Sequence, residues 1–393
     1  MKRICILMLA LLPITAAAQA EDVLKRGTGA EASGSSFAFG LFQDIAAYDE
    51  SDIVFISPLS ASIALSMTAA GAEGATQEEM LRTLGFGGLS VKDLNACNRG
   101  IIDLLSSDPE GVELNVANSL WVSDRFTLKS RYIRTAGSEY SARVSNLDFS
   151  DPASPAVINR WCAENTAGRI DKMIENIDPA TQMYLLNALY FKGMWTTPFD
   201  AANTRKDIFH GNRRDSEVEF MHRTASFQYY IGPEGALLEL PYGEGSFVMD
   251  IFLPAEGVSA EEFASGLDGE ALSTLTGLLQ SDRIKVTLPK FKAEYETSLN
   301  ATLQHLGMRD AFTPSADFSG MSKEPLMISE VKQKTFIEVN EEGSEAAAVT
   351  SVAVMRTSLA PEPLEFRVDR PFVFLIRELT SGTVLFMGLV RNL

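Results

Sequence analysis

The sequence predicts an α+β fold in which sizeable antiparallel sheets and several helices share one large hydrophobic core. Helical patterns dominate the first part of the chain, and strand patterns separated by turns dominate the last part, an order typical of α+β proteins. In addition, residues 58–72 are small or apolar on every side of a helix. Such a helix must be buried all round, which only a large single core provides.

The early helices carry recognisable start signals. Ser36 is a capping candidate for a first helix. The apolar face of that helix comprises Phe37, Leu41 and Ile45. Ser57 is predicted to cap the second helix, with Pro58 at its first position, where a missing N–H costs nothing. Thr76 and Glu79 have the spacing of a capping box, which predicts a further helix start at Thr76.

Strands are predicted at 54–56 and in four later stretches. Each stretch is rich in β-branched and aromatic residues and is bounded by turn residues. The four stretches are YLLNALYFKGMW, ALLELPYGEGSFVMDIFLP, RIKVTLPKF and RPFVFLIRELTSGTVLFMGLV.

The N-terminus has the features of a secretory signal peptide. Lys2 and Arg3 precede an apolar run over 4–14, and small residues lead up to a cleavage site after Ala20. The apolar run is shorter than the roughly 20 residues that a membrane anchor needs. We therefore expect residues 1–20 to be removed and the product to be secreted, into either the extracellular space or a periplasm.

After the signal peptide, residues 21–35 are expected to form a flexible leader and residues 36–393 a single domain. Length alone would suggest two domains, but no linker, repeat or low-complexity tract divides the longer segment. Cys97 and Cys162 are too few for a disulfide framework, so a hydrophobic core must hold the fold. We expect two semi-buried thiols, while a bond between them stays open.

Composition argues against several classes of partner. The formal net charge is −18, and loss of Lys2 and Arg3 changes it to about −20 (−18 − 2). Such a chain is poorly suited to nucleic acid, a heparin-like polyanion or an anionic membrane. We expect a soluble monomer.

Motifs of catalytic chemistry are missing from the sequence. It contains no G-x-S-x-G elbow, H-E-x-x-H helix or Walker loop. His210, His222 and His305 have no neighbouring Cys or carboxylate pattern typical of a metal site or triad, so we expect them to be structural or on the surface. No catalytic residue, metal or cofactor is predicted.

The stretch from Val339 to Pro363, VNEEGSEAAAVTSVAVMRTSLAPEP, is compatible with two structures. As a helix it would be capped by Ser344 and continue through strong helix-forming alanines. As a strand it would present an uncharged face at every second residue from Ser344 to Val354, suited to burial. Its polar, proline-rich end is typical of an exposed loop.

Six segments together resemble the serpin family, in the family's order and at its spacing. They are FISPLSASIALSMTAAGAEGATQEEM, LNALYFKGMW, VTLPKFK, ADFSGM, VNEEGSEAAAVT and DRPFVFLIRELTSGTVLFMG. The resemblance covers essentially the whole mature chain. It implies the serpin fold, with about nine helices around three β-sheets and an exposed reactive-centre loop at about 343–361.

The resemblance also implies a function. In inhibitory serpins a similar loop is cut by a serine protease and inserts as a new central strand of the largest sheet, which traps the protease as a covalent acyl complex. Small residues suit that insertion. The protein would then be a suicide substrate and not an enzyme. The alternative is a non-inhibitory serpin that acts as a carrier, chaperone or other binding protein, although such proteins often have charged or bulky residues at these alanine positions.

Individual residues match the family's motifs. The hinge of the loop matches Glu341, Glu342, Gly343, Ser344, Glu345, Ala346, Ala347, Ala348 and Thr350. The region where the sheet opens matches Ser57, Ser60, Asn187, Trp195 and Lys290, with Gln333 where the family commonly has histidine. Glutamine can donate and accept hydrogen bonds, but it cannot titrate. Lys290 and Glu341 match a charge pair that braces the hinge.

The spacing of the family places the reactive bond between Thr357 and Ser358, which suits an elastase-like protease. Arg356 is the only basic residue of the loop, and a trypsin-like protease would select it and cut between Arg356 and Thr357. Both assignments remain open.

Overall fold

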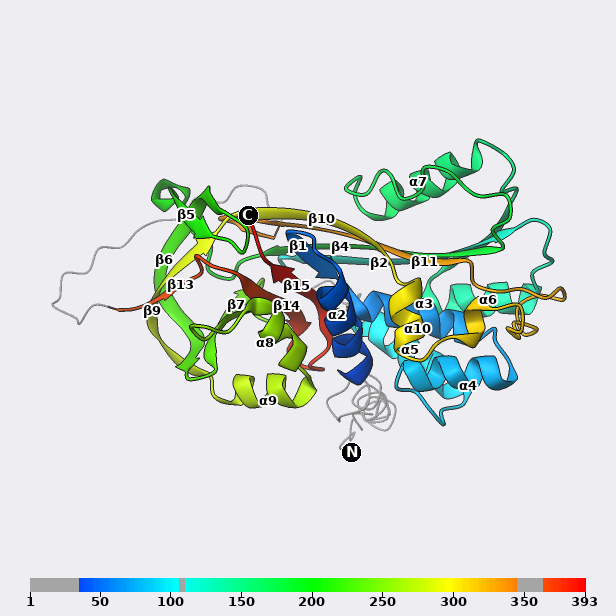
Figure 1. Cartoon of the computed structure of the whole chain (residues 1–393), viewed down its shortest axis with the longest axis horizontal. Helices are drawn as coiled ribbons and strands as arrows, with labels where there is room; N and C mark the ends of the chain where they lie inside the picture. The colour runs from blue at the N-terminus through cyan, green and yellow to red at the C-terminus, as the bar shows by residue number, and fades with distance from the viewer. Residues whose placement is uncertain (1–34, 106–109, 345–362) are drawn as a thin grey trace, which may run out of the picture.

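Two hydrogen-bonded sheets organise the computed structural model, which describes residues 35–105, 110–344 and 363–393 (Figure 1). The six-stranded sheet has the order β10 (Phe291–Ser298), β11 (Glu330–Val339), β12 (Gly343–Ser344), β4 (Met183–Met194), β2 (Val112–Ser123) and β3 (Arg143–Leu147). The nine-stranded sheet has the order β1 (Ile53–Ile56), β15 (Val384–Val390), β14 (Phe372–Glu378), β8 (Phe247–Pro254), β7 (Gly235–Tyr242), β6 (Asp215–Gly232), β9 (Gln280–Pro289) and β13 (Leu364–Arg367), with β5 (Arg205–His210) also paired to β6.

Nine α-helices accompany the sheets within the described ranges. They are α2 (Ser35–Tyr48), α3 (Pro58–Ala69), α4 (Gly74–Thr83), α5 (Val91–Leu105), α6 (Ser130–Tyr140), α7 (Ser154–Asn165), α8 (Ala260–Gly266), α9 (Gly269–Gly277) and α10 (Asn300–His305). Two short 3-10 turns, η1 (Ala201–Asn203) and η2 (Asp310–Phe312), complete them. This mixture confirms the predicted α+β class.

The structure has two hydrogen-bonded sheets where three were expected. The nine-stranded sheet combines two of the expected sheets, and strand β6 takes part in both of them. β6 has 18 residues, and its first half pairs with β5 and its last residues pair with β7. Since one continuous strand contributes to both pairings, two of the expected sheets merge into a single hydrogen-bonded ladder.

Helix α3 is buried on almost every side, as its composition predicts. Eleven of its twelve residues are buried. The hydroxyl of Ser57 caps it by accepting a hydrogen bond from the backbone N–H of Ser60 at 3.3 Å, and Pro58 occupies its first turn. The predicted cap is confirmed.

The capping box predicted at Thr76 is wrong. Helix α4 begins at Gly74, which places Thr76 inside the helix. Its hydroxyl donates to the carboxylate of Asp310 and accepts from the backbone N–H of Asp317 at 2.9 Å. The carboxylate of Glu79 accepts from the backbone of the same distant segment. Thr76 and Glu79 therefore form hydrogen bonds with a distant segment of the chain and do not cap the helix.

Helices cover both faces of the six-stranded sheet, with α7 on one face and α3 on the other (Figure 1). Side chains of β4 alternate accordingly. Tyr184 and Leu186 join a small core with α7, whereas Met183 and Leu185 join the main core. A strand inserted into this sheet would therefore meet covered surfaces on both faces.

Cys97 and Cys162, the cysteines within the described residues, are buried thiols that form no disulfide. Burial raises the pKa of Cys97 to about 11 and that of Cys162 to about 12, which makes both thiols poor nucleophiles near neutral pH. The segment predicted to be a signal peptide, residues 1–20, lies outside the described residues. Among the helices that are described, none has the length and apolar character needed to cross a membrane.

Candidate functional site

The boundary between β4 and β11, called the seam here, is closed at one end and open at the other. The two strands pair in parallel from Tyr184 and Glu330 to Leu189 and Thr335. Beyond that point β12 lies between them and pairs with both. Gly343 and Ser344 of β12 therefore separate β4 from β11 at the open end of the seam.

A buried polar cluster ties the closed part of the seam to the start of α3. The amide nitrogen of Gln333 donates to Asn187 Oδ1 at 2.9 Å and to the Ser57 carbonyl at 2.9 Å. Its amide oxygen accepts from the backbone N–H of Ser57 at 2.8 Å. Asn187 also donates to the hydroxyl of Ser60. The structure thus brings together four residues that the sequence proposed for one region.

Asn118 on β2 is a fifth member of this cluster that sequence reasoning missed. Its amide oxygen accepts from the Asn187 side chain at 2.5 Å. Its amide nitrogen is buried and has no hydrogen-bond partner among the described residues. The signal in the sequence is weak, because an asparagine in a strand pattern indicates burial only after its neighbours are known.

Opening the closed part of the seam must break one specific side-chain bond. Gln333 and Asn187 lie directly opposite each other across β11 and β4. A strand that enters between them separates the amide groups. Both amides are also bonded to the start of α3, Gln333 through Ser57 and Asn187 through Ser60. The cluster therefore has to exchange hydrogen bonds when the sheet opens.

At the open end, Trp195 and Tyr242 hold the first residues of the hinge. The indole N–H of Trp195 donates to the Asn340 carbonyl at 2.9 Å, and its backbone N–H donates to the Glu342 carbonyl at 2.8 Å. Its ring stacks on Tyr242 with centroids 4.4 Å apart. The Tyr242 hydroxyl lies 2.7 Å from the hydroxyl of Ser344, which is fully buried. Tyr242 and Asn340 were not identified from the sequence.

Lys290 and Glu341 form the expected charge pair beside the hinge. Lys290 Nζ lies 3.2 Å from carboxylates of both Glu341 and Glu219. Thr204 adds a hydrogen bond to Glu341 at 2.7 Å. Burial by itself would raise the pKa of Glu341, but the hydrogen bonds from Thr204 and Lys290 outweigh it and lower the pKa below the usual 4.5. The ionised form of Glu341 is therefore favoured in the folded state.

The histidines lie apart from the seam cluster. His210 contacts Asp215, His305 contacts Asp44, and His222 lies 3.0 Å from the Thr287 hydroxyl. Within the described ranges no group of three or more His, Cys, Asp or Glu side chains is arranged to hold a metal ion.

Part of the proposed hinge and the reactive bond cannot be placed. Outside the described residues lie Glu345, Ala346, Ala347, Ala348, Thr350, Arg356, Thr357 and Ser358.

We expect Glu341→Gln to lower the free energy of unfolding by about 1 kcal/mol at pH 7, because the ion pair with Lys290 is lost. A lowered folded pKa contributes stability above the unfolded value of about 4.5, and this contribution disappears as pH falls through the folded value. Urea unfolding followed by circular dichroism should show the two proteins converging as pH falls through the folded pKa of Glu341, which lies below 4.5.

Glu338→Gln is the matched control, because Glu338 lies near the end of β11, shortly before Glu341 in the chain, and makes no ion pair with a described residue. It should change stability little at any pH. A Glu341→Gln deficit that stays equally large from pH 7 down to the lowest pH at which both proteins fold would show that ionisation of Glu341 is not the cause.

Comparisons with known proteins agree with this architecture. The family model described as "Serpin (serine protease inhibitor)" matches residues 32–393. Iripin-2 of Ixodes ricinus is 37% identical over 353 residues, which cover 86% of this chain and 88% of that protein. Intracellular coagulation inhibitor 2 of Tachypleus tridentatus is 37% identical, with 88% and 87% covered.

A solved structure has a similar fold over nearly the whole chain. The thermophilic serpin tengpin in its native state superposes with a TM-score of 0.85 at 34% sequence identity, and the match covers 92% of this chain and 93% of that one. Sequence and fold agree over nearly the whole length, and the chain belongs to the serpin family.

Proposed function

We propose that this protein is a secreted inhibitor that traps serine proteases by inserting its cut loop into the six-stranded sheet. The observation that carries the proposal is the position of β12. Gly343 pairs with Met194 and Ser344 with Gly193, so the first hinge residues already lie between β4 and β11. The entrance to the seam is open where the loop begins.

The register of β12 predicts where the rest of the loop would go after cleavage. Continued antiparallel to β4 from the pairing of Ser344 with Gly193, it brings Thr350 opposite Asn187. Continued along β11 from the pairing of Ser344 with Val339, it brings Thr350 opposite Gln333. The two extrapolations agree. The Thr350 hydroxyl would therefore meet the two amides that insertion separates and could replace their lost bond.

The same register assigns the faces of the inserted strand. Residues of even number from Ser344 to Val354 would face the main core, because Ser344 already does. None of them carries a charge. Glu345 would point to the other face, between Lys192 and Glu338, which are both half-buried. The sequence is thus matched to the sheet that would receive it.

The proposed trap is a competition between two rates. The serine Oγ of the protease attacks the carbonyl carbon of the reactive residue, the peptide C–N bond breaks, and the new amine leaves with the C-terminal segment. Hydrolysis of the resulting ester needs an intact oxyanion hole and an oriented histidine in the protease. If insertion carries the protease across the sheet first and distorts that site, the ester persists.

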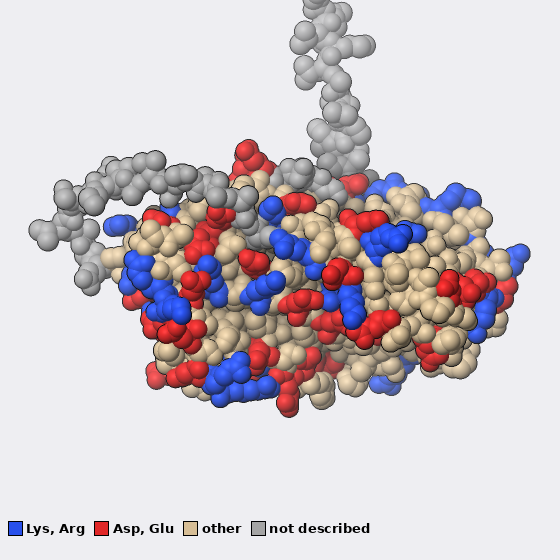
Figure 2. Space-filling view, turned by 90° about the horizontal axis from the view of Figure 1, so that it is seen from above, with Lys and Arg blue, Asp and Glu red and all other residues tan. Residues whose placement is uncertain are grey.

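Partner and compartment follow from the sequence. The N-terminal 20 residues support export, and the expected product is a monomer. On the face that Figure 2 shows, Lys and Arg side chains are interspersed with Asp and Glu and do not gather in one patch. This arrangement, with the net charge of −18, supports the expectation that polyanions such as heparin are not partners.

Denaturing gels test the proposal directly. The mature protein is incubated with a panel of elastase-like and trypsin-like serine proteases. A stable band at the summed mass of inhibitor and protease supports trapping. Cleavage without that band for every protease would favour the non-inhibitory alternative, a carrier or chaperone.

Cleavage of the loop should raise the thermal unfolding midpoint, because insertion relieves strain stored in the intact sheet. Calorimetry of intact and cleaved protein measures the effect. A cleaved form that melts at or below the intact form would rule out insertion.

Replacing Ala346 with Arg should convert the inhibitor to a substrate. Its position would face the main core, and an unpaired buried charge costs several kcal/mol. The matched control is Glu345→Arg, at the adjacent position with the opposite, half-exposed face. Gels should show cleavage of both variants but a covalent complex only with the control. An undiminished complex with Ala346→Arg would show that the register is wrong.

The reactive bond should lie between Thr357 and Ser358 for elastase-like proteases and between Arg356 and Thr357 for trypsin-like ones. Mass spectrometry of the C-terminal peptide released on denaturing the complex identifies the bond. The peptide should begin at Ser358 in the first case and at Thr357 in the second. A peptide that begins before Arg356 or after Leu359 would contradict both assignments.

A further inference from the structure

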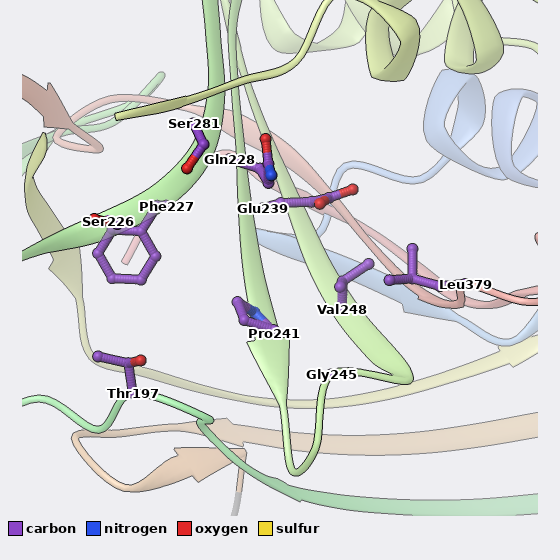
Figure 3. Close-up of a pocket in the computed structure, with 10 residues that line it drawn as sticks. All are labelled: Thr197, Ser226, Phe227, Gln228, Glu239, Pro241, Gly245, Val248, Ser281 and Leu379. Carbon is purple, nitrogen blue, oxygen red and sulfur yellow. The ribbon is translucent and has the colours of Figure 1, made fainter. Parts of the chain in front are cut away.

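A cavity of about 320 Å³ opens on the nine-stranded sheet, where β6, β7, β8 and the start of β9 meet (Figure 3). The proposed inhibitory function does not use it. Its lining combines exposed polar side chains, a half-buried carboxylate and apolar side chains. Cavities of this size and mixed lining are typical of sites for small organic molecules.

A row of polar residues crosses the strands and leads from solvent to the buried interior. Ser281 lies opposite Gln228, Gln228 opposite Glu239, and Glu239 opposite Asp250. Directly opposed residues share a face of the sheet. Ser281 and Gln228 are exposed, the Glu239 side chain is 12% exposed, and Asp250 is fully buried. In the cavity Gln228, Glu239 and Ser281 lie on neighbouring strands (Figure 3).

The buried end of this row carries more negative than positive charge. Arg377 donates to Glu239 Oε1 at 2.5 Å and holds Asp250 with two hydrogen bonds. One guanidinium therefore serves two carboxylates, which leaves one formal negative charge. Among the described residues Glu239 has no second cationic partner within ion-pair distance. Burial, and then the charge of Asp250, raises the pKa of Glu239.

Apolar side chains form the other side of the cavity. Val248 is almost fully buried, while Leu379 is 40% exposed and stands at the rim. Pro241 lies beside Val248 on the adjacent strand. In Figure 3 these three side chains lie on the side away from Ser281. A ligand held by Glu239 would place its remaining atoms against them.

We propose that this cavity binds a small organic cation, a primary amine with a compact apolar or aromatic body. The ammonium group would pair with Glu239. Its positive charge would balance the formal negative charge that remains because one guanidinium, that of Arg377, faces both Glu239 and Asp250. The body would pack on Val248, Pro241 and Leu379, and Gln228 and Ser281 would accept remaining hydrogen bonds. A bare metal ion fits poorly, since the space far exceeds one ion and only one carboxylate lines it.

Calorimetric titration of the mature protein with 2-phenylethylamine tests the proposal, and 2-phenylethanol serves as its neutral counterpart of similar shape. We expect saturable binding of the amine and at least tenfold weaker binding of the alcohol, because only the amine gains the ion pair. The proposal is overturned if the amine does not bind saturably, or if both probes bind equally.

Two variants locate the binding. Ser281→Trp should fill the mouth of the cavity and abolish amine binding, whereas Ser273→Trp, on the exposed face of α9 away from the cavity, should leave it unchanged. Glu239→Gln should reduce the affinity for the amine to that for the alcohol. If loss of the Arg377 partner prevents Glu239→Gln from folding, Ser281→Trp still decides. Unchanged amine affinity in Ser281→Trp would place binding elsewhere and falsify the assignment.

Discussion

The hydrogen bond between Gln333 and Asn187 is the interaction on which the rest of the structure depends. It joins two parallel strands that pair in the intact protein and that the proposed loop insertion would separate. Apolar contacts at this point would be lost without replacement when a strand enters. Amide groups can exchange one partner for another at small net cost, since a satisfied hydrogen bond contributes only about 1 kcal/mol net, whereas an unsatisfied buried amide costs about 1 to 3 kcal/mol. The buried polar cluster thus suits the sheet opening that the proposed inhibitory mechanism requires.

That requirement explains the surroundings of the seam. The start of helix α3 carries the small residues Ser57, Ser60 and Ala61, so its first turn can approach the sheet closely and bring Ser57 and Ser60 to the cluster. At the other end Trp195 and Tyr242 hold the hinge with one stacking contact and a few hydrogen bonds. The seam is therefore closed by strand pairing and by the polar cluster between Tyr184 and Leu189 of β4, and β12 separates β4 from β11 beyond that point.

Two features of α3 could be predicted from the sequence because their signals are local. The cap at Ser57 and the all-round burial of the helix each depend on neighbours within a few positions. The seam residues Asn187 and Gln333 were identified only through the resemblance to the serpin family, and the alternation of small residues after Ser344 stays a prediction. The missed features depend on distant partners. Thr76 bonds to Asp310, 234 positions away, which overrides its capping spacing. Tyr242 joins the hinge only because β7 ends beside β12 in space, and nothing around Tyr242 in the sequence indicates that contact.

Glutamine at position 333 has a further consequence for the seam. It donates to Asn187 and accepts from the Ser57 backbone at the same time, which a neutral imidazole could also do, but its hydrogen-bonding pattern does not change with pH. The three histidines of the chain contact Asp215, Asp44 and Thr287, and none of them joins the cluster. No group in the cluster titrates between about pH 5 and 8. In the proposed mechanism, opening of the closed part of the seam would therefore act through strand pairing and hinge contacts, because protonation within the cluster cannot supply the signal.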